Sequence, residues 1–242
     1  MLNESDLKDF MSNFYGYGML NSDIWMIGME EGGGNSIEEI QARLKHWVEG
    51  GRCITEDVAE YHEKFGMGYF FSEKPKNQST WNKLIRIMLA YHEIDTTLQN
   101  VKEFQRDEFA RHDSNNCLLE LFPLPSPSTG HWLYSTVSDI PWLKTRKAYK
   151  EHLAPHRIAM LKELIELNGP ELVVFYGNNP EYREYWTAIV DAPFSEITLD
   201  GRTAYRAEKG RTQFYIVSHP VATGITVEYF HELGRLARAP LN

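Results

Sequence analysis

Features that mark membrane, secreted or disordered proteins are scarce in this sequence. No apolar run approaches the roughly 18 residues that a membrane-spanning helix needs. Two cysteines, Cys53 and Cys117, are too few for a disulfide framework or a four-thiolate metal or iron–sulfur site. With 11 prolines and 17 glycines in 242 residues, the composition excludes collagen-like and low-complexity chains. The opening segment MLNESDLKDF is acidic and polar, which argues against a secretory signal. We therefore expect a cytoplasmic monomer without a membrane partner.

Acidic residues outnumber basic ones, and the excess is unevenly distributed. The formal net charge is −9, and the surplus of acids lies in residues 1–63. By contrast, residues 140–157 are rich in basic side chains, among them Lys144, Arg146, Lys147 and Lys150. Such a stretch favours contact with phosphates, so we expect these four residues to bind single- or double-stranded DNA weakly and in a salt-dependent way.

Four short apolar runs predict buried strands at residues 23–28, 117–122, 172–177 and 213–219. Apolar residues at helical spacing predict helices that include residues 36–48, 79–89, 155–167 and 226–238. The strand runs do not alternate apolar and polar residues, which is typical of parallel strands covered on both faces. Right-handed crossovers then place helices on both sides of the sheet. We predict a single α/β domain over residues 1–242, a three-layer α/β/α arrangement with a central parallel four-stranded sheet. A small hairpin is predicted around Asp200 and Gly201.

Polar residues follow the predicted strands at their carboxyl ends, where parallel sheets bind ligands. Glu30 and Glu31 follow the first strand, Glu120 lies in the second, and His219 ends the fourth. Each also has a simpler interpretation. The two acids suit the N-terminus of the next helix, and a lone histidine at a strand end is commonly structural.

Cofactor and metal sites have little support in the sequence. The loop at residues 28–34 lacks both GxGxxG and Gly-Lys-Ser/Thr, and its carboxylates would repel a phosphate. His152 and His156 lie one helical turn apart, but no third ligand is suggested. We therefore expect neither a cofactor nor a metal.

The order of short motifs resembles that of the uracil-DNA glycosylase superfamily. Gly28-Met-Glu-Glu-Gly-Gly follows the first strand, Phe70-Phe-Ser comes later, Ser79-Thr-Trp-Asn-Lys-Leu opens a helix, and His219-Pro precedes the last helix. The resemblance extends from residue 22 to the C-terminus. It implies a parallel four-stranded sheet between helices and an enzyme that removes a base flipped out of DNA.

The resemblance also implies catalytic roles. Glu30, with Glu31 beside it, falls at the acid that positions water and stabilises the sugar cation. His219 falls at the histidine that donates a hydrogen bond to the oxygen of the departing base, and Pro220 falls in the same DNA-contacting motif. Such a set fits the chemistry, because breaking an N-glycosidic bond develops positive charge on the sugar and negative charge on the base.

Base binding is implied for three further residues. Phe71 falls at the aromatic residue that stacks on the extruded base, and Met29 joins the base-binding set. Glu120 replaces an asparagine that reads the base edge. An ionised carboxylate accepts from uracil N3–H but cannot donate to O4, so this replacement predicts poor excision of plain uracil. We expect Glu30, Phe71, Glu120 and His219 to line one cleft at the carboxyl edge of the sheet.

Two other interpretations remain open. The first is a catalytically silent relative that binds nucleic acid or a nucleotide, which Glu120 and the acidic residues 1–63 favour. The second is an unrelated small-molecule hydrolase that uses Glu30 or Glu31 with His219 as an acid–base pair.

Overall fold

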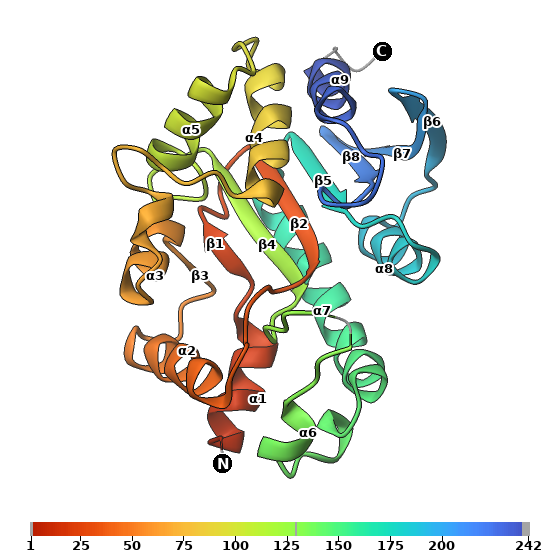
Figure 1. The fold of residues 1–242 in the computed structure, drawn as a ribbon. Helices are drawn as coiled ribbons and strands as arrows, with labels where there is room; N and C mark the ends of the chain where they lie inside the picture. The colour runs from red at the N-terminus through yellow and green to blue at the C-terminus, as the bar shows by residue number, and fades with distance from the viewer. Residues whose placement is uncertain (1, 129, 239–242) are drawn as a thin grey trace.

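A mixed sheet of eight strands forms the centre of the computed structural model, which describes residues 2–128 and 130–238 (Figure 1). Its strand order is β3-β1-β4-β2-β5-β8-β7-β6. The strands are β1 (Gly16–Gly18), β2 (Ile24–Glu30), β3 (Thr55–Glu56), β4 (Asn116–Phe122), β5 (Leu172–Tyr176), β6 (Ser195–Leu199), β7 (Arg202–Lys209) and β8 (Thr212–Val217).

The predicted α/β class is confirmed, whereas the prediction of a four-stranded parallel sheet is wrong. The four predicted strands are β4, β2, β5 and β8, which are neighbours and pair in parallel. The sheet is larger and mixed because β1 pairs antiparallel with β4, and the hairpin of β6 and β7 pairs antiparallel with β8. At the other edge, β3 pairs in parallel with β1. The predicted hairpin around Asp200 and Gly201 is confirmed as β6 and β7. The sequence concealed the opposite edge, because β1 has only three residues and β3 only two.

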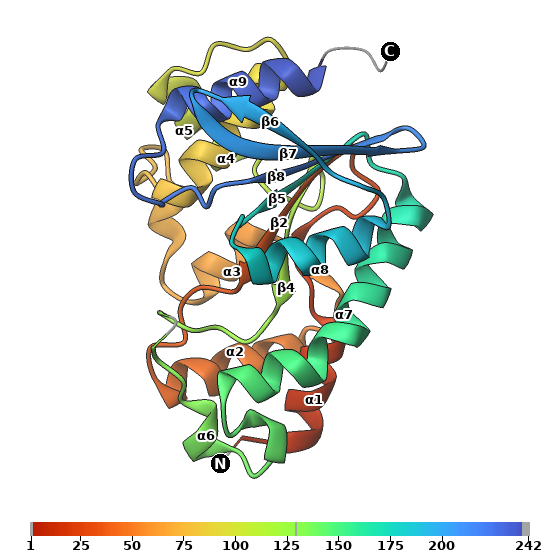
Figure 2. The same ribbon diagram turned by 90° about the vertical axis from the view of Figure 1, so that its right-hand side faces the viewer.

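Helices cover both faces of the sheet. They are α1 (Glu4–Asn13), α2 (Ile37–Glu49), α3 (Val58–Lys64), α4 (Ser79–Tyr91), α5 (Leu98–Asp107), α6 (Tyr134–Val137), α7 (Arg146–Asn168), α8 (Pro180–Val190) and α9 (Val227–Arg238), with 3₁₀ turns at Gly68–Phe70 and Pro141–Leu143. Figure 2 shows α4 and α9 on one side of the sheet, and α7 and α8 on the other. No helix in the described ranges has both the length and the apolar character required to cross a bilayer.

Helix α7 starts nine residues earlier than Pro155, where the sequence predicts its beginning. Thr145 caps it, because its Oγ1 accepts a hydrogen bond of 3.1 Å from the amide of Ala148. Proline favours the first turn of a helix, but here Pro155 lies inside one. Burial of Tyr149 and Leu153 in the first half stabilises the longer helix.

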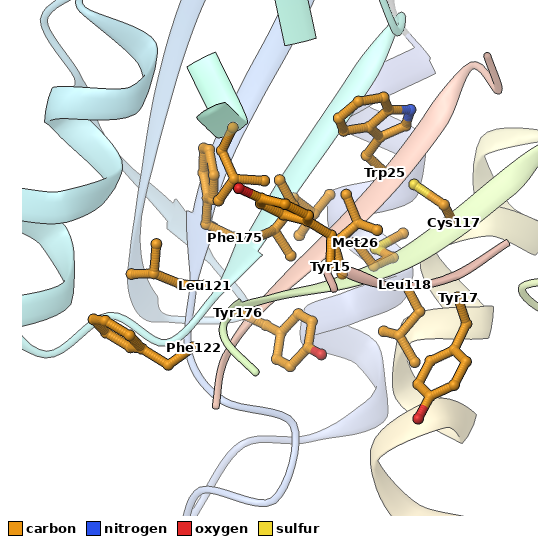
Figure 3. Packing of buried hydrophobic residues seen from close by; sticks show 14 of the residues in the cluster. Tyr15, Tyr17, Trp25, Met26, Cys117, Leu118, Leu121, Phe122, Phe175 and Tyr176 are labelled. Carbon is orange, nitrogen blue, oxygen red and sulfur yellow. The ribbon is translucent and has the colours of Figure 1, made fainter. Parts of the chain in front are cut away.

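The core joins side chains from neighbouring strands (Figure 3). Trp25 and Met26 of β2 are fully buried, as is Phe175 of β5. Arg157 of α7 is also fully buried. Its guanidinium donates to the carbonyls of Glu120 (2.8 Å), Leu121 (2.8 Å) and Phe14 (2.7 Å). A buried charge needs such partners, and these hold the carboxyl end of β4 in place.

Candidate functional site

Glu120 and Tyr176 meet at the carboxyl edge of the parallel strands. The Tyr176 hydroxyl donates a hydrogen bond of 2.6 Å to Oε1 of Glu120. Gly28 of β2, in register with Glu120, lies beneath this pair. A Cβ atom on Gly28 would lie 2.3 Å from both Glu120 Oε2 and Tyr176 Oη, so only glycine leaves room for the two side chains.

The environment of Glu120 favours its protonated form. Burial raises the pKa of its carboxyl group well above the ordinary value, and the charge of Glu31 adds to the shift against the opposing effects of Tyr176 and Arg157. Since Oε1 accepts from Tyr176, the proton belongs on Oε2, which is buried without a hydrogen-bond partner in the described part of the chain. A protonated Glu120 has one donor and one acceptor, unlike the ionised carboxylate assumed from the sequence.

His219 lies beside this pair, just beyond the end of β8. Its ring centroid is 5.9 Å from that of Tyr176. Nδ1 accepts a hydrogen bond of 3.3 Å from the amide of Val221, so the neutral imidazole carries its proton on Nε2. Burial lowers the pKa of His219, and the nearby Lys83 ammonium lowers it further. At neutral pH, His219 is thus a neutral donor through Nε2.

Glu30 is directed toward α7 and α8. Its carboxylate forms an ion pair with Arg146 and lies 3.2 Å from Nζ of Lys150. The Tyr182 hydroxyl donates a hydrogen bond of 2.8 Å to the same carboxylate. Two cations therefore offset its charge, and the Glu30 side chain is only 13% exposed.

Glu31 is directed differently. Its Oε1 accepts from the Tyr17 hydroxyl at 3.3 Å and lies 3.5 Å from Nη1 of Arg43. The negative charge of Glu31 raises the pKa of both Glu120 and Tyr176, which indicates that its field reaches the Glu120 site. Glu31 also lines a closed cavity of about 10 Å³. That volume is near the lower limit for one water molecule.

Phe71 belongs to an aromatic cluster between α3 and α4. Its ring centroid is 5.7 Å from His62 and 5.6 Å from Trp81. The ring centroid of His62 is in turn 6.2 Å from that of Tyr17, whose hydroxyl donates a hydrogen bond to Glu31. Phe71 is only partly buried, so its ring keeps some access to solvent.

Met29 supports the turn after β5. A Cβ atom on Gly177 would lie 2.4 Å from the Met29 sulfur, so this side chain lies directly against the turn. The contacts thus divide the predicted set. Glu120 and His219 gather around Tyr176, and the charge of Glu31 acts on Glu120 and Tyr176. Glu30 turns toward α7 and α8, and Phe71 lies in the α3–α4 cluster.

Two of the four predicted DNA-binding cations are engaged inside the protein. The side chains of Arg146 and Lys150 are 14% and 12% exposed, because both contact Glu30. Lys147 is 85% exposed, and Nζ of Lys144 donates to the carbonyl of Ser138 at 2.9 Å. Of the four predicted cations, Lys144 and Lys147 are therefore the two exposed ones, and Lys147 also lies 3.6 Å from the Glu151 carboxylate.

The last predicted DNA contact, Pro220, is buried, and its carbonyl accepts a hydrogen bond from Lys83. The next residue, Val221, is 56% exposed. Sequence reasoning missed Lys83, although the motif Ser79-Thr-Trp-Asn-Lys-Leu contains it. It also missed Tyr176, which closes a predicted strand.

Other ligand sites find little support in the contacts. The Glu39 carboxylate accepts from the amides of Gly34 and Asn35, both at 2.9 Å, so these loop amides already bind an anion. Among the residues that the structure describes, no three His, Cys, Asp or Glu side chains come together as a metal site requires. His152 instead stacks on Trp142, with ring centroids 4.2 Å apart.

Neither a model of a known protein family nor a curated protein sequence matches this chain. The functional interpretation therefore depends on the sequence motifs and on the geometry of the sheet edge.

Proposed function

We propose that this chain is a DNA glycosylase-like protein that hydrolyses the N-glycosidic bond of a damaged or deaminated base flipped out of DNA. The observation that carries the proposal is the row of neutral donors at the carboxyl edge of the sheet. Glu120, Tyr176 and His219 come together there, and the charge of the Glu31 carboxylate acts on Glu120 and Tyr176.

The charges suit the bond to be broken. As the bond between C1′ and the base nitrogen lengthens, negative charge develops on the base and positive charge on the sugar. His219 Nε2–H and the neutral Glu120 acid are donors for the base oxygens. A water molecule then adds its oxygen to C1′ and keeps one hydrogen as the new hydroxyl group. Its other proton passes to a carboxylate and from there to the departed base anion.

We assign the carboxylate role to Glu31 rather than to Glu30. The sequence favours Glu30, but two cations already offset its charge. Glu31 has one cation, Arg43, at the longer distance of 3.5 Å. Burial raises the pKa of Glu31, which makes it a better proton acceptor than an exposed carboxylate.

A neutral Glu120 changes the expected base preference. Its Oε2–H can donate to a base carbonyl, and the Tyr176 hydroxyl oxygen can accept from a ring N–H. We therefore propose that plain uracil is a substrate, in contrast to the expectation for an ionised carboxylate. Because Oε2 is closed to solvent, a base reaches it only after a side chain at this edge moves.

We further propose a cytoplasmic monomer that binds DNA weakly. Lys144 and Lys147 are exposed, and their contacts with the Ser138 carbonyl and the Glu151 carboxylate would have to yield to phosphates. With few phosphate contacts, affinity depends mainly on the flipped base and falls as salt is added.

Abasic-site formation tests the proposal. Single- and double-stranded oligonucleotides that carry uracil, hypoxanthine or only normal bases are incubated with the protein and then cleaved with alkali. We expect strand breaks at the modified base, and their loss in His219→Ala. His92→Ala is the matched control, because His92 is exposed on the end of α4. No breaks with any oligonucleotide, with folding confirmed, would refute base excision.

A silent nucleic-acid or nucleotide binder is the second candidate. The Glu120 carboxyl oxygen Oε2, which is closed to solvent, favours a protein without catalytic activity. Retention of a labelled oligonucleotide without abasic product in the same assay would select this candidate.

A further inference from the structure

Lys83 of α4 joins this helix to the loop that follows β8. Its ammonium donates hydrogen bonds to the carbonyl of Pro220 and, at 3.2 Å, to that of Ile225. These two carbonyls lie near the two ends of the segment 219–226. Lys83 therefore clamps the loop, and its hydrogen-bond partners are backbone carbonyls rather than a carboxylate.

The clamped loop carries His219. The amide of Val221 donates to Nδ1 of His219, and this contact depends on the backbone course that Lys83 holds. The charged and titratable groups around the imidazole are Tyr176 from β5 and Lys83 from α4. Tyr229 of α9 contacts the neighbouring Ser218 amide, and Glu120 lies on the far side of Tyr176.

We infer that Lys83 is a positioning residue for His219, which clamps the 219–226 loop so that Nε2–H faces the departing base. The inference rests on the proposed function for the departing base, whereas the hold of Lys83 on the loop and on His219 rests on the contacts alone. The positive charge of Lys83 has a second consequence, because it disfavours a second proton on the imidazole. Protonation would place a hydrogen on Nδ1, where the Val221 amide now donates, and would break that contact.

A purely structural clamp makes a different prediction from a positioning residue. If Lys83 only anchors the loop, a loss of anchoring at another point should have the same effect on His219. Thr226 offers this comparison, because it anchors the same loop at another point. Its hydroxyl donates a hydrogen bond of 2.5 Å to the Asp200 carboxylate and accepts one of 3.2 Å from the Tyr229 amide. Thr226→Val loosens the loop without removal of a cation.

Histidine NMR titration across pH tests the inference in four full-length proteins: wild type, Lys83→Met, Lys83→Arg and Thr226→Val. We expect a higher His219 pKa in Lys83→Met alone, and Nε2–H as the neutral tautomer in wild type. An unchanged His219 pKa in Lys83→Met, or an equal rise in Thr226→Val, would overturn the inference.

Single-turnover excision of uracil provides the second measurement. Lys83→Met should lower the rate at saturating DNA by about ten- to a hundredfold, as expected for a misplaced donor, with rescue by Lys83→Arg. The acid limb of the rate profile should move to higher pH in Lys83→Met, because His219 accepts its second proton more readily. If wild type releases no base, the proposed function fails, and the titration by itself still decides the role of Lys83.

Discussion

Glu30 and Glu31 are adjacent in sequence, yet their carboxylates lie in opposite surroundings. Glu30 is held by Arg146, Lys150 and the Tyr182 hydroxyl, all from α7 and α8. Glu31 contacts Tyr17 of β1 and Arg43 of α2. Successive side chains at a strand end point in different directions, so neighbours in the chain reach different helices.

The comparison teaches that partners, rather than residue type, decide what a carboxylate can do. Because it pairs with two cations, Glu30 links β2 to the first turns of α7 through ion pairs. Glu31 retains enough uncompensated charge to shift the pKa of Glu120 and Tyr176. The following changes would break or sharpen this distinction.

The largest effect is expected from Glu31→Gln. Removal of a charge that stabilises the sugar cation should lower single-turnover excision by about a hundred- to a thousandfold. Glu30→Gln should lower the excision rate by less than about tenfold in the same assay, because two cations already offset the charge of Glu30. Glu38→Gln, exposed on α2, serves as the control. A greater loss in Glu30→Gln would return the catalytic role to Glu30.

Glu30→Gln should instead weaken the fold. It leaves the half-buried charges of Arg146 and Lys150 without their shared counter-ion, at a cost of about 3 kcal/mol in the free energy of unfolding. Urea denaturation measures this cost. Glu49→Gln breaks an exposed ion pair with Lys45 and should change the same free energy by less than about 0.5 kcal/mol. Equal values for the two variants would show that the Glu30 cluster adds no stability.

Glu120→Gln should alter the pH dependence of stability. A carboxyl group whose pKa is raised on folding binds its proton more tightly in the folded state. Its contribution is therefore present below the unfolded pKa and is lost as pH rises above it, by up to ~1.4 kcal/mol per pH unit. Glutamine has no proton to lose, so the variant should lack this part of the slope.

The matched comparison isolates Glu120. Burial also raises the pKa of Glu31, and it raises that of Glu56 to about 7, but both acids are present in wild type and variant. Urea denaturation at several pH values between about 5 and 8 gives the difference. Identical slopes would mean that Glu120 is ionised in the folded protein.

The smallest effect is expected at the protein surface. Joint replacement of Lys144 and Lys147 by alanine should weaken DNA binding severalfold and lower the slope of log affinity against log salt by about two. Lys45→Ala, on the exposed face of α2, is the control. Fluorescence anisotropy at several salt concentrations measures both. An unchanged slope in the double variant would place the phosphate contacts elsewhere.

Strand patterns were the most reliable guide to the fold. The four apolar runs predicted β2, β4, β5 and β8 because each is long and buried throughout most of its length. The segment Gly16-Tyr-Gly of β1 offered no such pattern, since its strand character depends on pairing with β4. The beginning of α7 was missed because Pro155 resembled a first helical residue.

The sequence by itself determined which polar residues lie at the carboxyl edge, because runs without alternation predict parallel strands, whose carboxyl ends share one edge of the sheet. Only the tertiary structure decided that two cations offset the charge of Glu30 and that burial raises the pKa of Glu120. Glu30 meets Arg146 across 116 residues of chain, and Glu120 meets Tyr176 across 56. A pKa depends on burial and on charges close in space, and neither quantity is present in the local sequence.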